Sequence, residues 1–344
     1  MASQTYLNWI IEHTDTRWWH DSAEAAELDL GLARGAVGVT TNPVLAASAL
    51  KKDRELWGDA IDRALARDLP PEQQAEALMK VAVTKAAEKL MPQFLASNGH
   101  AGFVCAQVNP IRAGDRDCMY PMAKRFHAWA PNIAVKLPAT AAGLDVLEDC
   151  IAEGMTITAT VSFTVPQVVA VAERHRAGMK RAHANGIEAG KCFAVIMIGR
   201  LDDYLREVAH DCQAKVSESD LCQAGLAAAK RAYSIYQARR YEAMLLVAAI
   251  RGSYHLTELA GAALVMSIHP AYQEMFVSKE FPREARIEHP VHAAVIERLQ
   301  QMPDFVRAYE PDGLSPSEFV GFGLTQRTLS QFSEAGWKQL ESFR

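Results

Sequence analysis

The sequence lacks long apolar runs, an excess of basic residues and any sign of an export signal. Among its 344 residues, no apolar stretch approaches the ~18 residues that cross a membrane. The N-terminus has neither a basic cluster nor the apolar segment of a secretion signal. A formal net charge of −5 offers no basic surface for nucleic-acid phosphates. We therefore expect a soluble, cytoplasmic protein that binds a small molecule, with no nucleic-acid or membrane partner.

Closely spaced cysteines and the common cofactor motifs are also missing. The six cysteines form no CxxC pair, which suits free thiols in a reducing compartment. No GxxxxGK[ST], HExxH, EF-hand or GxSxG pattern occurs. His289 and His292 have no third ligand nearby in the sequence, so we interpret them as surface residues and predict no metal site.

The sequence does contain eight short apolar runs, each followed by a turn and a longer segment with helical periodicity. The runs are 17–22, 37–42, 103–108, 132–137, 156–162, 191–198, 243–250 and 263–269. The expected helices are 23–34, a long helical stretch over 44–96, 116–129, 141–153, 165–184, 218–239 and short pieces from Tyr254 and Ala271.

Alternating strands and helices imply parallel pairing, and eight units in this length match a (β/α)8 TIM barrel. No linker suggests two separate domains. We therefore predict a single barrel domain over residues 1–344, with its core at about 17–277. Residues 1–16 are expected to add an N-terminal helix and residues 278–344 a C-terminal helical extension.

Polar residues stand near the ends of five consecutive predicted strands. Alternation along each strand places them on one face, and the carboxyl ends of barrel strands form the mouth where chemistry occurs. These residues are Asp21, Thr40 with Asn42, Gln107, Lys136, and Thr158 with Thr160. Since a barrel interior is usually filled by Val, Ile and Leu, this set predicts a binding or catalytic pocket.

Lys136 is the most unusual member, because it interrupts the apolar run NIAVKLP. Lysine is rarely buried unless it is paired. Burial lowers the pKa of an ammonium group and frees an amine that can attack carbonyls. The alternative is a strand-end lysine paired with a carboxylate such as Asp21. The other inward polar groups favour the nucleophile.

Five motifs together resemble the transaldolase family, including its fructose-6-phosphate aldolase branch. They are GVTTNPVL (38–45), KLPATAAGLDVLEDCIAEGM (136–155), TATVSFTVPQ (158–167), IGRLDDY (198–204) and YEAMLLVAAIRG (241–252). The resemblance implies a class I aldolase on a TIM barrel that acts on sugar phosphates of the pentose phosphate type without cofactor or metal. It also implies that Lys136 forms a Schiff base with a ketose.

The resemblance assigns roles to further residues. It implies a proton-transferring aspartate on the first strand, for which Asp21 and Asp15 both compete. Asp21 is favoured because it ends the strand and precedes a helix start. The remaining matches are Thr40 and Asn42 for donor hydroxyls, Thr160 for a catalytic water, Thr158 where classical transaldolases have asparagine, and Arg200 with Arg251 for the terminal phosphate.

Several positions depart from the classical transaldolase pattern. Gln107 replaces a glutamate, as in the aldolase branch, and can orient water but cannot take its proton. Met197 stands where the branches have Phe or Tyr, and Val195 and Ala249 replace serines near the phosphate. The segment 168–190 is also longer than usual, and its role is open.

Three hypotheses follow. The first is transfer of a dihydroxyacetone unit between phosphorylated ketoses and aldoses. The second is simple aldol cleavage on a different anionic or unphosphorylated substrate, and the third is an inactive sugar-phosphate-binding barrel. The sequence does not determine the oligomeric state, and a homo-oligomer is compatible with it.

Overall fold

Eight parallel strands form a closed barrel in chain order in the computed structural model, which describes residues 5–52 and 54–344. The strands are β1 (Arg17–Asp21), β2 (Gly38–Thr40), β3 (Phe103–Gln107), β4 (Ile133–Pro138), β5 (Ile157–Thr160), β6 (Cys192–Met197), β7 (Met244–Ala248) and β8 (Val265–Ile268). Each pairs with the next, and β8 pairs with β1. The (β/α)8 prediction and all eight predicted strand positions are confirmed, with ends shifted by a few residues.

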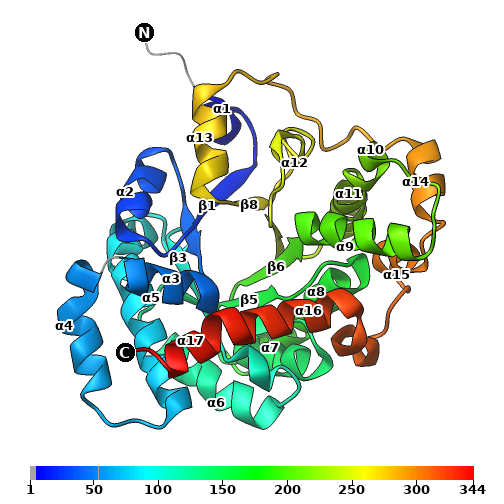
Figure 1. Cartoon of the computed structure of the whole chain (residues 1–344). Helices are drawn as coiled ribbons and strands as arrows, with labels where there is room; N and C mark the ends of the chain where they lie inside the picture. The colour runs from blue at the N-terminus through cyan, green and yellow to red at the C-terminus, as the bar shows by residue number, and fades with distance from the viewer. Residues whose placement is uncertain (1–4, 53) are drawn as a thin grey trace.

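Helices surround the barrel and connect successive strands (Figure 1). They are α2 (Ala25–Ala33), α3 (Pro43–Lys52), α4 (Arg54–Leu65), α5 (Pro71–Ala96), α6 (Arg116–His127), α7 (Ala141–Ala152), α8 (Val165–Ala184), α9 (Ile198–Asp211), α10 (Glu218–Leu221), α11 (Ala224–Arg239), α12 (Ser253–Thr257) and α13 (Pro270–Ser278), with the short turn η1 (Pro110–Arg112) before α6.

Three predictions about the helices need correction. The long helical stretch over 44–96 is divided among α3, α4 and α5, and α5 begins at Pro71 because proline lacks the N–H of a helix interior and suits the first turn. The sequence predicts a strand up to Ile198, but α9 begins at that residue. This helix was not predicted. The uninterrupted apolar run CFAVIMI offered no boundary between strand and helix. The segment predicted as one helix over 218–239 is α10 followed by α11.

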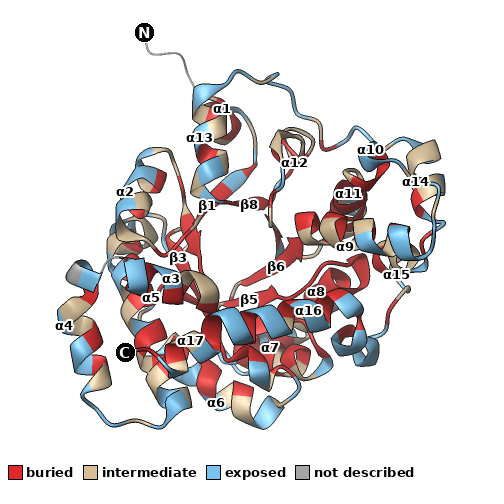
Figure 2. Cartoon of the chain, in the orientation of Figure 1, coloured by how far each residue is buried: buried red, intermediate tan, exposed pale blue. Residues whose placement is uncertain are grey.

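Aromatic side chains fill the barrel interior below its mouth. The ring centroids of Trp19 and Phe193 are 4.5 Å apart, and Phe103 lies 5.5 Å from Phe193. Gly38 leaves the space that the Trp19 ring occupies, because a Cβ there would come within 2.5 Å of it. The strands and inward helix faces are buried (Figure 2). This packing leaves the polar strand ends at the opposite, carboxyl end of the barrel.

Further helices precede and follow the barrel along the chain. The N-terminal helix is α1 (Tyr6–His13), and residues 1–4 of the predicted segment lie outside the described residues. The C-terminal extension contains α14 (Ala293–Leu299), α15 (Pro303–Tyr309), η2 (Pro316–Gly321), α16 (Gly323–Phe332), the π-helical turn η3 (Ser333–Trp337) and α17 (Lys338–Glu341).

The last three elements form one rod that packs across the start of α3 (Figure 1). Gly336 permits this close approach, because a Cβ there would lie 2.7 Å from the main-chain nitrogen of Val44. Since α3 follows directly after β2, the extension reaches the edge of the barrel mouth.

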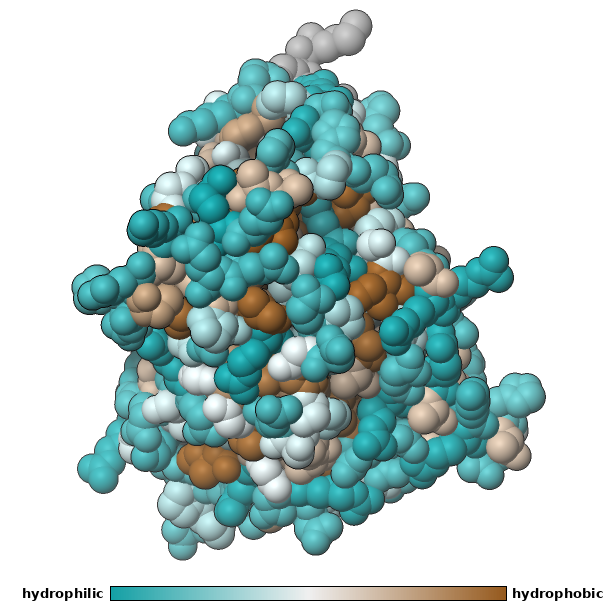
Figure 3. All heavy atoms as spheres, turned by 90° about the vertical axis from the view of Figure 1, so that its right-hand side faces the viewer, coloured by the Kyte–Doolittle hydropathy of each residue, from teal (hydrophilic) through white to brown (hydrophobic). Residues whose placement is uncertain are grey.

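Within residues 5–52 and 54–344, no helix is long and apolar enough to cross a membrane. The face that carries α14 and α15 is mostly hydrophilic, with apolar patches separated by polar side chains (Figure 3). The long segment 168–190 extends α8 on the outside of the barrel, where it packs on α7 and α11, and contributes nothing to the cavity described next.

Candidate active site

A cavity of about 150 Å³ opens at the carboxyl ends of the strands. It is lined by Asp21, Thr40, Asn42, Lys136, Thr160, Val195, Met197, Arg200, Leu246, Ala248, Ala249, Arg251, Ser267 and Phe332. Seven of the nine predicted site residues are among them. The other two, Gln107 and Thr158, are buried and do not line it.

Lys136 lies on β4 with only 6% of its surface exposed. Its Nζ donates a hydrogen bond to the main-chain carbonyl of Thr41 at 3.0 Å, and no ion pair of Lys136 occurs in the described part of the chain. Burial lowers the pKa of Lys136, and the positive charge of Arg200 lowers it further, against the opposite effect of Cys105 and Asp21. The side chain is therefore suited to act as a free amine.

Asp21 ends β1 and points its carboxylate into the same cavity. The Thr40 hydroxyl donates to Asp21 Oδ1 at 2.7 Å. Because that hydrogen is used, the Ser267 hydroxyl must supply the donor in its 2.6 Å contact with Thr40. Asp15, the competing candidate, is exposed in the bend before β1, at the other end of that strand. The geometry thus favours Asp21 for chemistry at the cavity.

Asn42 is half-buried and uses the two ends of its amide differently. Its Oδ1 accepts hydrogen bonds from the main-chain nitrogens of Val44 and Leu45 at 2.9 and 3.0 Å, which caps α3. The side-chain oxygen of Asn42 therefore stabilises the turn that leads into α3. Because the oxygen is occupied, the amide nitrogen is the group that can donate to a ligand in the cavity.

Thr160 and Gln107 carry buried oxygen atoms, Oγ1 and Oε1, without a hydrogen-bond partner among the described residues. The hydroxyl of Thr158, by contrast, accepts a contact from Cys105 Sγ at 3.5 Å. Val161, directly after Thr160, has a positive φ of 54°, a strained conformation for a β-branched residue. Thr160 is thus held at the mouth with a free hydroxyl, while Thr158 already has a partner.

Arg200 lies in the first turn of α9 at the edge of the cavity. Its Nη1 donates to Gln331 Oε1 at 2.6 Å, and its guanidinium carbon is 5.3 Å from the centre of the Phe332 ring. Burial lowers the pKa of Arg200, and the nearby charge of Arg251 lowers it further. Two cations that repel each other at one end of a cavity favour an anionic ligand.

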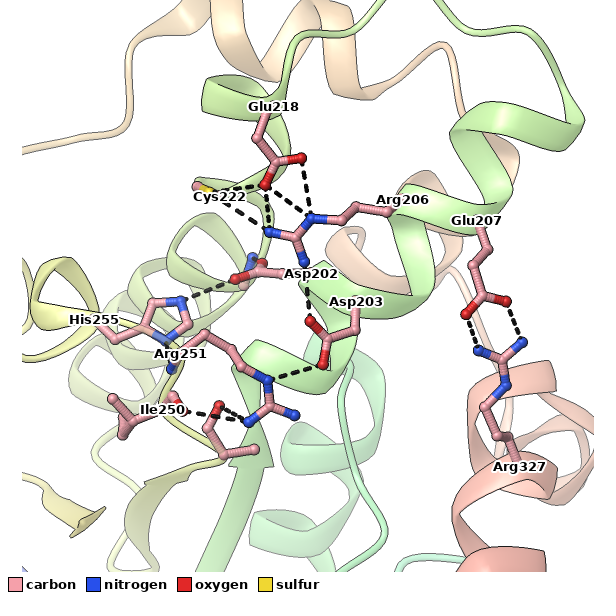
Figure 4. Close-up of polar contacts among 12 residues, drawn as sticks. Asp202, Asp203, Arg206, Glu207, Glu218, Cys222, Ile250, Arg251, His255 and Arg327 are labelled. Atoms are coloured by element: carbon pink, nitrogen blue, oxygen red, sulfur yellow. Dashed lines mark hydrogen bonds and ion pairs between the residues drawn. The ribbon is translucent and has the colours of Figure 1, made fainter. Parts of the chain in front are cut away.

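Arg251 is the second cation and follows β7. Its Nε donates to Asp203 Oδ2 at 2.8 Å, and Nη1 contacts the carbonyl oxygens of Ala249 and Ile250 at 3.2 and 3.3 Å (Figure 4). Ala249 has a positive φ of 61°, so this turn is held in an uncommon conformation.

The opposite wall of the cavity is apolar. Val195 and Met197 on β6 and Leu246 and Ala248 on β7 face it. None of these side chains offers a hydroxyl or amide to a ligand. The polar side chains of the cavity therefore come from β1, β2, β4, β5 and β8. The two arginines, Arg200 and Arg251, follow the apolar strands β6 and β7 in the chain.

Sequence reasoning missed the contribution of the C-terminal extension and the residues that hold Arg251. Phe332 and Gln331 come from α16, far from the barrel motifs in the sequence, and no local pattern indicated their position. His255 and Asp202 are both fully buried and lie 2.9 Å apart. The pair of adjacent aspartates in IGRLDDY was the available signal for Asp202.

His289 is exposed and His292 caps α14 through its Nδ1. Across residues 5–52 and 54–344 there is no group of three or more His, Cys, Asp or Glu side chains arranged to hold a metal ion.

Most of the chain matches a known protein family. The family model Transaldolase/Fructose-6-phosphate aldolase matches residues 18–315. The chain belongs to the transaldolase family. This membership makes it an enzyme of the transaldolase or aldolase type.

Individual relatives are distant. The chain is 26% identical to the transaldolase of Thiobacillus denitrificans over 316 residues, which cover 90% of this chain and 87% of that protein. It is 29% identical to transaldolase 2 of Streptomyces avermitilis over 59% of this chain and 55% of the relative. A transaldolase of Neisseria gonorrhoeae is 29% identical over 53% of each chain. The chain thus spans only about half the length of the last two relatives.

Proposed function

We propose that this family member is a class I aldolase that uses Lys136 to move a dihydroxyacetone unit between phosphorylated sugars. The observation that supports this most strongly is a buried lysine with a lowered pKa in the same cavity as Asp21, with two arginines at its edge. The names of the relatives support the same activity.

The first chemical stage is formation of an imine. The neutral Lys136 amine attacks the ketose C2 carbonyl, and the resulting carbinolamine takes up a proton from solvent and loses water to give the iminium. Asp21 then takes the proton of the C4 hydroxyl while the C3–C4 bond breaks, and the electron pair of that bond moves into the iminium. An aldose leaves, and an enamine of the three-carbon unit remains on Lys136. The iminium withdraws the electrons that a metal would otherwise polarise, so the step needs no metal.

The second stage decides between transfer and cleavage. If a second aldose enters, the enamine attacks its aldehyde carbon, and Asp21 returns the proton to the new hydroxyl. If water enters, the enamine is protonated at carbon and the imine is hydrolysed. Thr160 and Gln107 are the groups proposed to orient that water, because their buried oxygens have no other partner in the described part of the chain.

The two arginines are proposed to bind the terminal phosphate. Guanidinium groups suit phosphate because they present several donors in one plane. Arg251 uses Nε and Nη1 within the protein, so its Nη2 is the donor left for a ligand among the contacts of the described residues. Thr40 and the Asn42 amide are proposed to hold hydroxyls of the donor sugar.

A second candidate is aldol cleavage without transfer. One observation favours it: the wall formed by Val195 and Met197 lacks hydroxyls. An acceptor sugar with many hydroxyls would leave them unpaired against this wall, which costs about 1–3 kcal/mol for each.

A coupled assay separates these candidates. Purified protein is incubated with fructose 6-phosphate, and release of glyceraldehyde 3-phosphate is followed with and without erythrose 4-phosphate. Release that requires the acceptor supports transfer, and release without acceptor supports cleavage. No release in either arm, while the protein still binds fructose 6-phosphate, contradicts both and favours an inactive binding barrel.

A further inference from the structure

Arg251 is held by two adjacent carboxylates of α9 through two different routes (Figure 4). Asp203 accepts directly from the Arg251 side chain, with Nε and Oδ2 2.8 Å apart. Asp202 reaches the same residue through His255, whose Nδ1 lies 3.1 Å from the main-chain nitrogen of Arg251. One carboxylate therefore holds the guanidinium, and the other holds the peptide that carries it.

The hydrogen bonds of His255 fix its protonation pattern. A main-chain nitrogen can only donate, so His255 Nδ1 must accept from Arg251. The remaining ring hydrogen is then on Nε2, which donates to Asp202 Oδ2 at 2.9 Å. Asp202 Oδ1 accepts from the main-chain nitrogen of Gly225 at 2.8 Å. Every polar atom of this pair therefore has a partner, although both side chains are fully buried.

The surroundings leave Arg251 little freedom. Gly199, at the start of α9, permits the arginine to pass, because a Cβ there would lie 2.4 Å from Arg251 Cγ and 2.0 Å from the Ala249 carbonyl oxygen. Asp203 is itself held by Arg206, whose Nη1 lies 2.9 Å from Asp203 Oδ1. Arg206 is anchored in turn on Glu218 at 2.6 Å. The direct route thus belongs to an exposed ion-pair network, whereas the route through His255 is shielded from solvent and salt.

We infer that Asp202 and His255 are a positioning pair that fixes the Arg251 main chain so that its guanidinium meets the anionic end of the substrate. This inference rests on the proposed phosphate-binding function of Arg251. The pair touches no reacting atom, so its effect is on the recognition of the anion rather than on the chemistry at Lys136.

Variants of the pair test this inference. His255→Leu removes both hydrogen bonds, while His255→Gln keeps one acceptor and one donor. Asp202→Asn is nearly isosteric. Whichever way its amide is turned, the NH2 group faces another hydrogen-bond donor, either His255 Nε2 or the Gly225 main-chain nitrogen, so one hydrogen bond is lost. His175→Leu is the matched control, because His175 is also buried and its Nε2 contacts the Gly190 carbonyl at 3.1 Å, on the outer helix α8.

The first readout is the dissociation constant for inorganic phosphate, measured by calorimetry on the folded full chain, which does not depend on turnover. Loss of a hydrogen bond worth 0.5–1.5 kcal/mol predicts that His255→Leu and Asp202→Asn weaken phosphate binding about 2- to 10-fold. We expect His255→Gln to recover most of this affinity and His175→Leu to bind as the parent protein does. Thermal unfolding identifies any variant that has simply lost its fold.

The second readout separates recognition from chemistry. In His255→Leu we expect KM for fructose 6-phosphate to rise by a similar factor, while kcat and the borohydride-trapped adduct from unphosphorylated dihydroxyacetone stay unchanged. Equal phosphate affinity in parent, His255→Leu and Asp202→Asn would overturn the inference. A parent protein that binds phosphate but traps no ketose would instead contradict the proposed aldolase function and leave the result on the positioning pair valid.

Discussion

The Nζ of Lys136 lies 3.0 Å from the main-chain carbonyl oxygen of Thr41, which is a neutral partner. A carboxylate at that distance would stabilise the ammonium form and raise the pKa of the lysine, whereas a carbonyl directs the nitrogen without adding a charge. Burial therefore dominates, and the pKa of Lys136 is lowered. This relationship is the physical basis for assigning the nucleophile.

Replacing Lys136 with methionine should abolish turnover and stabilise the fold. Because the pKa of Lys136 is lower in the folded chain than in the unfolded chain, the unfolded state binds the proton more readily. The resulting cost to stability is complete below the folded pKa and disappears as pH rises toward the unfolded value. We expect Lys136→Met to unfold at a higher Tm near neutral pH, with a difference that shrinks in alkaline buffer. A lower Tm at all pH values would contradict this.

The same lowered pKa predicts how imine formation depends on pH. The neutral amine is the nucleophile, so the rate of imine formation should rise with pH and level off above the pKa of Lys136, below the ordinary range of lysine. Single-turnover trapping at a series of pH values measures this midpoint. A midpoint at the ordinary lysine value would show that burial does not activate the amine.

Asp21→Asn should impair bond cleavage without preventing imine formation. Loss of a positioned general base typically reduces the rate about 10²- to 10⁴-fold, and the Thr40 contact at 2.7 Å can persist with an amide oxygen. The check is kcat together with borohydride trapping. Asp15→Asn is the control and should keep the parent kcat, because Asp15 is exposed before β1. If Asp15→Asn lost activity and Asp21→Asn did not, the assignment would be wrong.

Phe332→Leu should weaken recognition of the phosphorylated end of the substrate. Leucine keeps an apolar side chain at this buried position but removes the ring that lies 5.3 Å from the Arg200 guanidinium. A cation–π contact of about 0.5–1 kcal/mol predicts a rise of roughly 2- to 5-fold in KM for fructose 6-phosphate. Steady-state kinetics measure it, and unphosphorylated fructose provides the comparison. An equal effect on both sugars would show that Phe332 acts by general packing.

Met197→Tyr should shift the outcome of the reaction toward cleavage. A hydroxyl at this wall position adds a donor that can orient water near the imine, which the thioether of Met197 cannot do. Release of glyceraldehyde 3-phosphate is not informative alone, so free dihydroxyacetone is measured in the absence of an acceptor. We expect more of it per unit of enzyme than from the parent protein. An unchanged yield would mean that water is oriented elsewhere.

The sequence was sufficient to predict the barrel and most of the polar cavity, because both depend on regular alternation along short strands. Lys136 and Asp21 stand at the ends of such strands, and their common location follows from parallel pairing. Phe332 could not be predicted in this way, since its place depends on how α16 (Gly323–Phe332), which is separated from the last strand, β8 (Val265–Ile268), by several other helices, packs across the mouth.

The network around Arg251 was missed for a related reason. His255 lies four residues after Arg251, and its partner Asp202 comes from α9, which was not recognised as a helix. Without that helix, the two aspartates of LDD could not be assigned to opposite contacts of one arginine. Leu201, Leu205 and Ala209 are buried at four-residue intervals along α9, a helical pattern that lies between the predicted strand 191–198 and the predicted helix 218–239, where no element was predicted.

The most direct test of the central claim is the mass of the Lys136 peptide after borohydride reduction in the presence of fructose 6-phosphate. The account predicts a reduced three-carbon adduct on Lys136, absent in Lys136→Met and accumulating in the parent protein when no acceptor is added. An adduct on another lysine, or an unmodified Lys136 in a folded protein that binds the sugar phosphate, would contradict it.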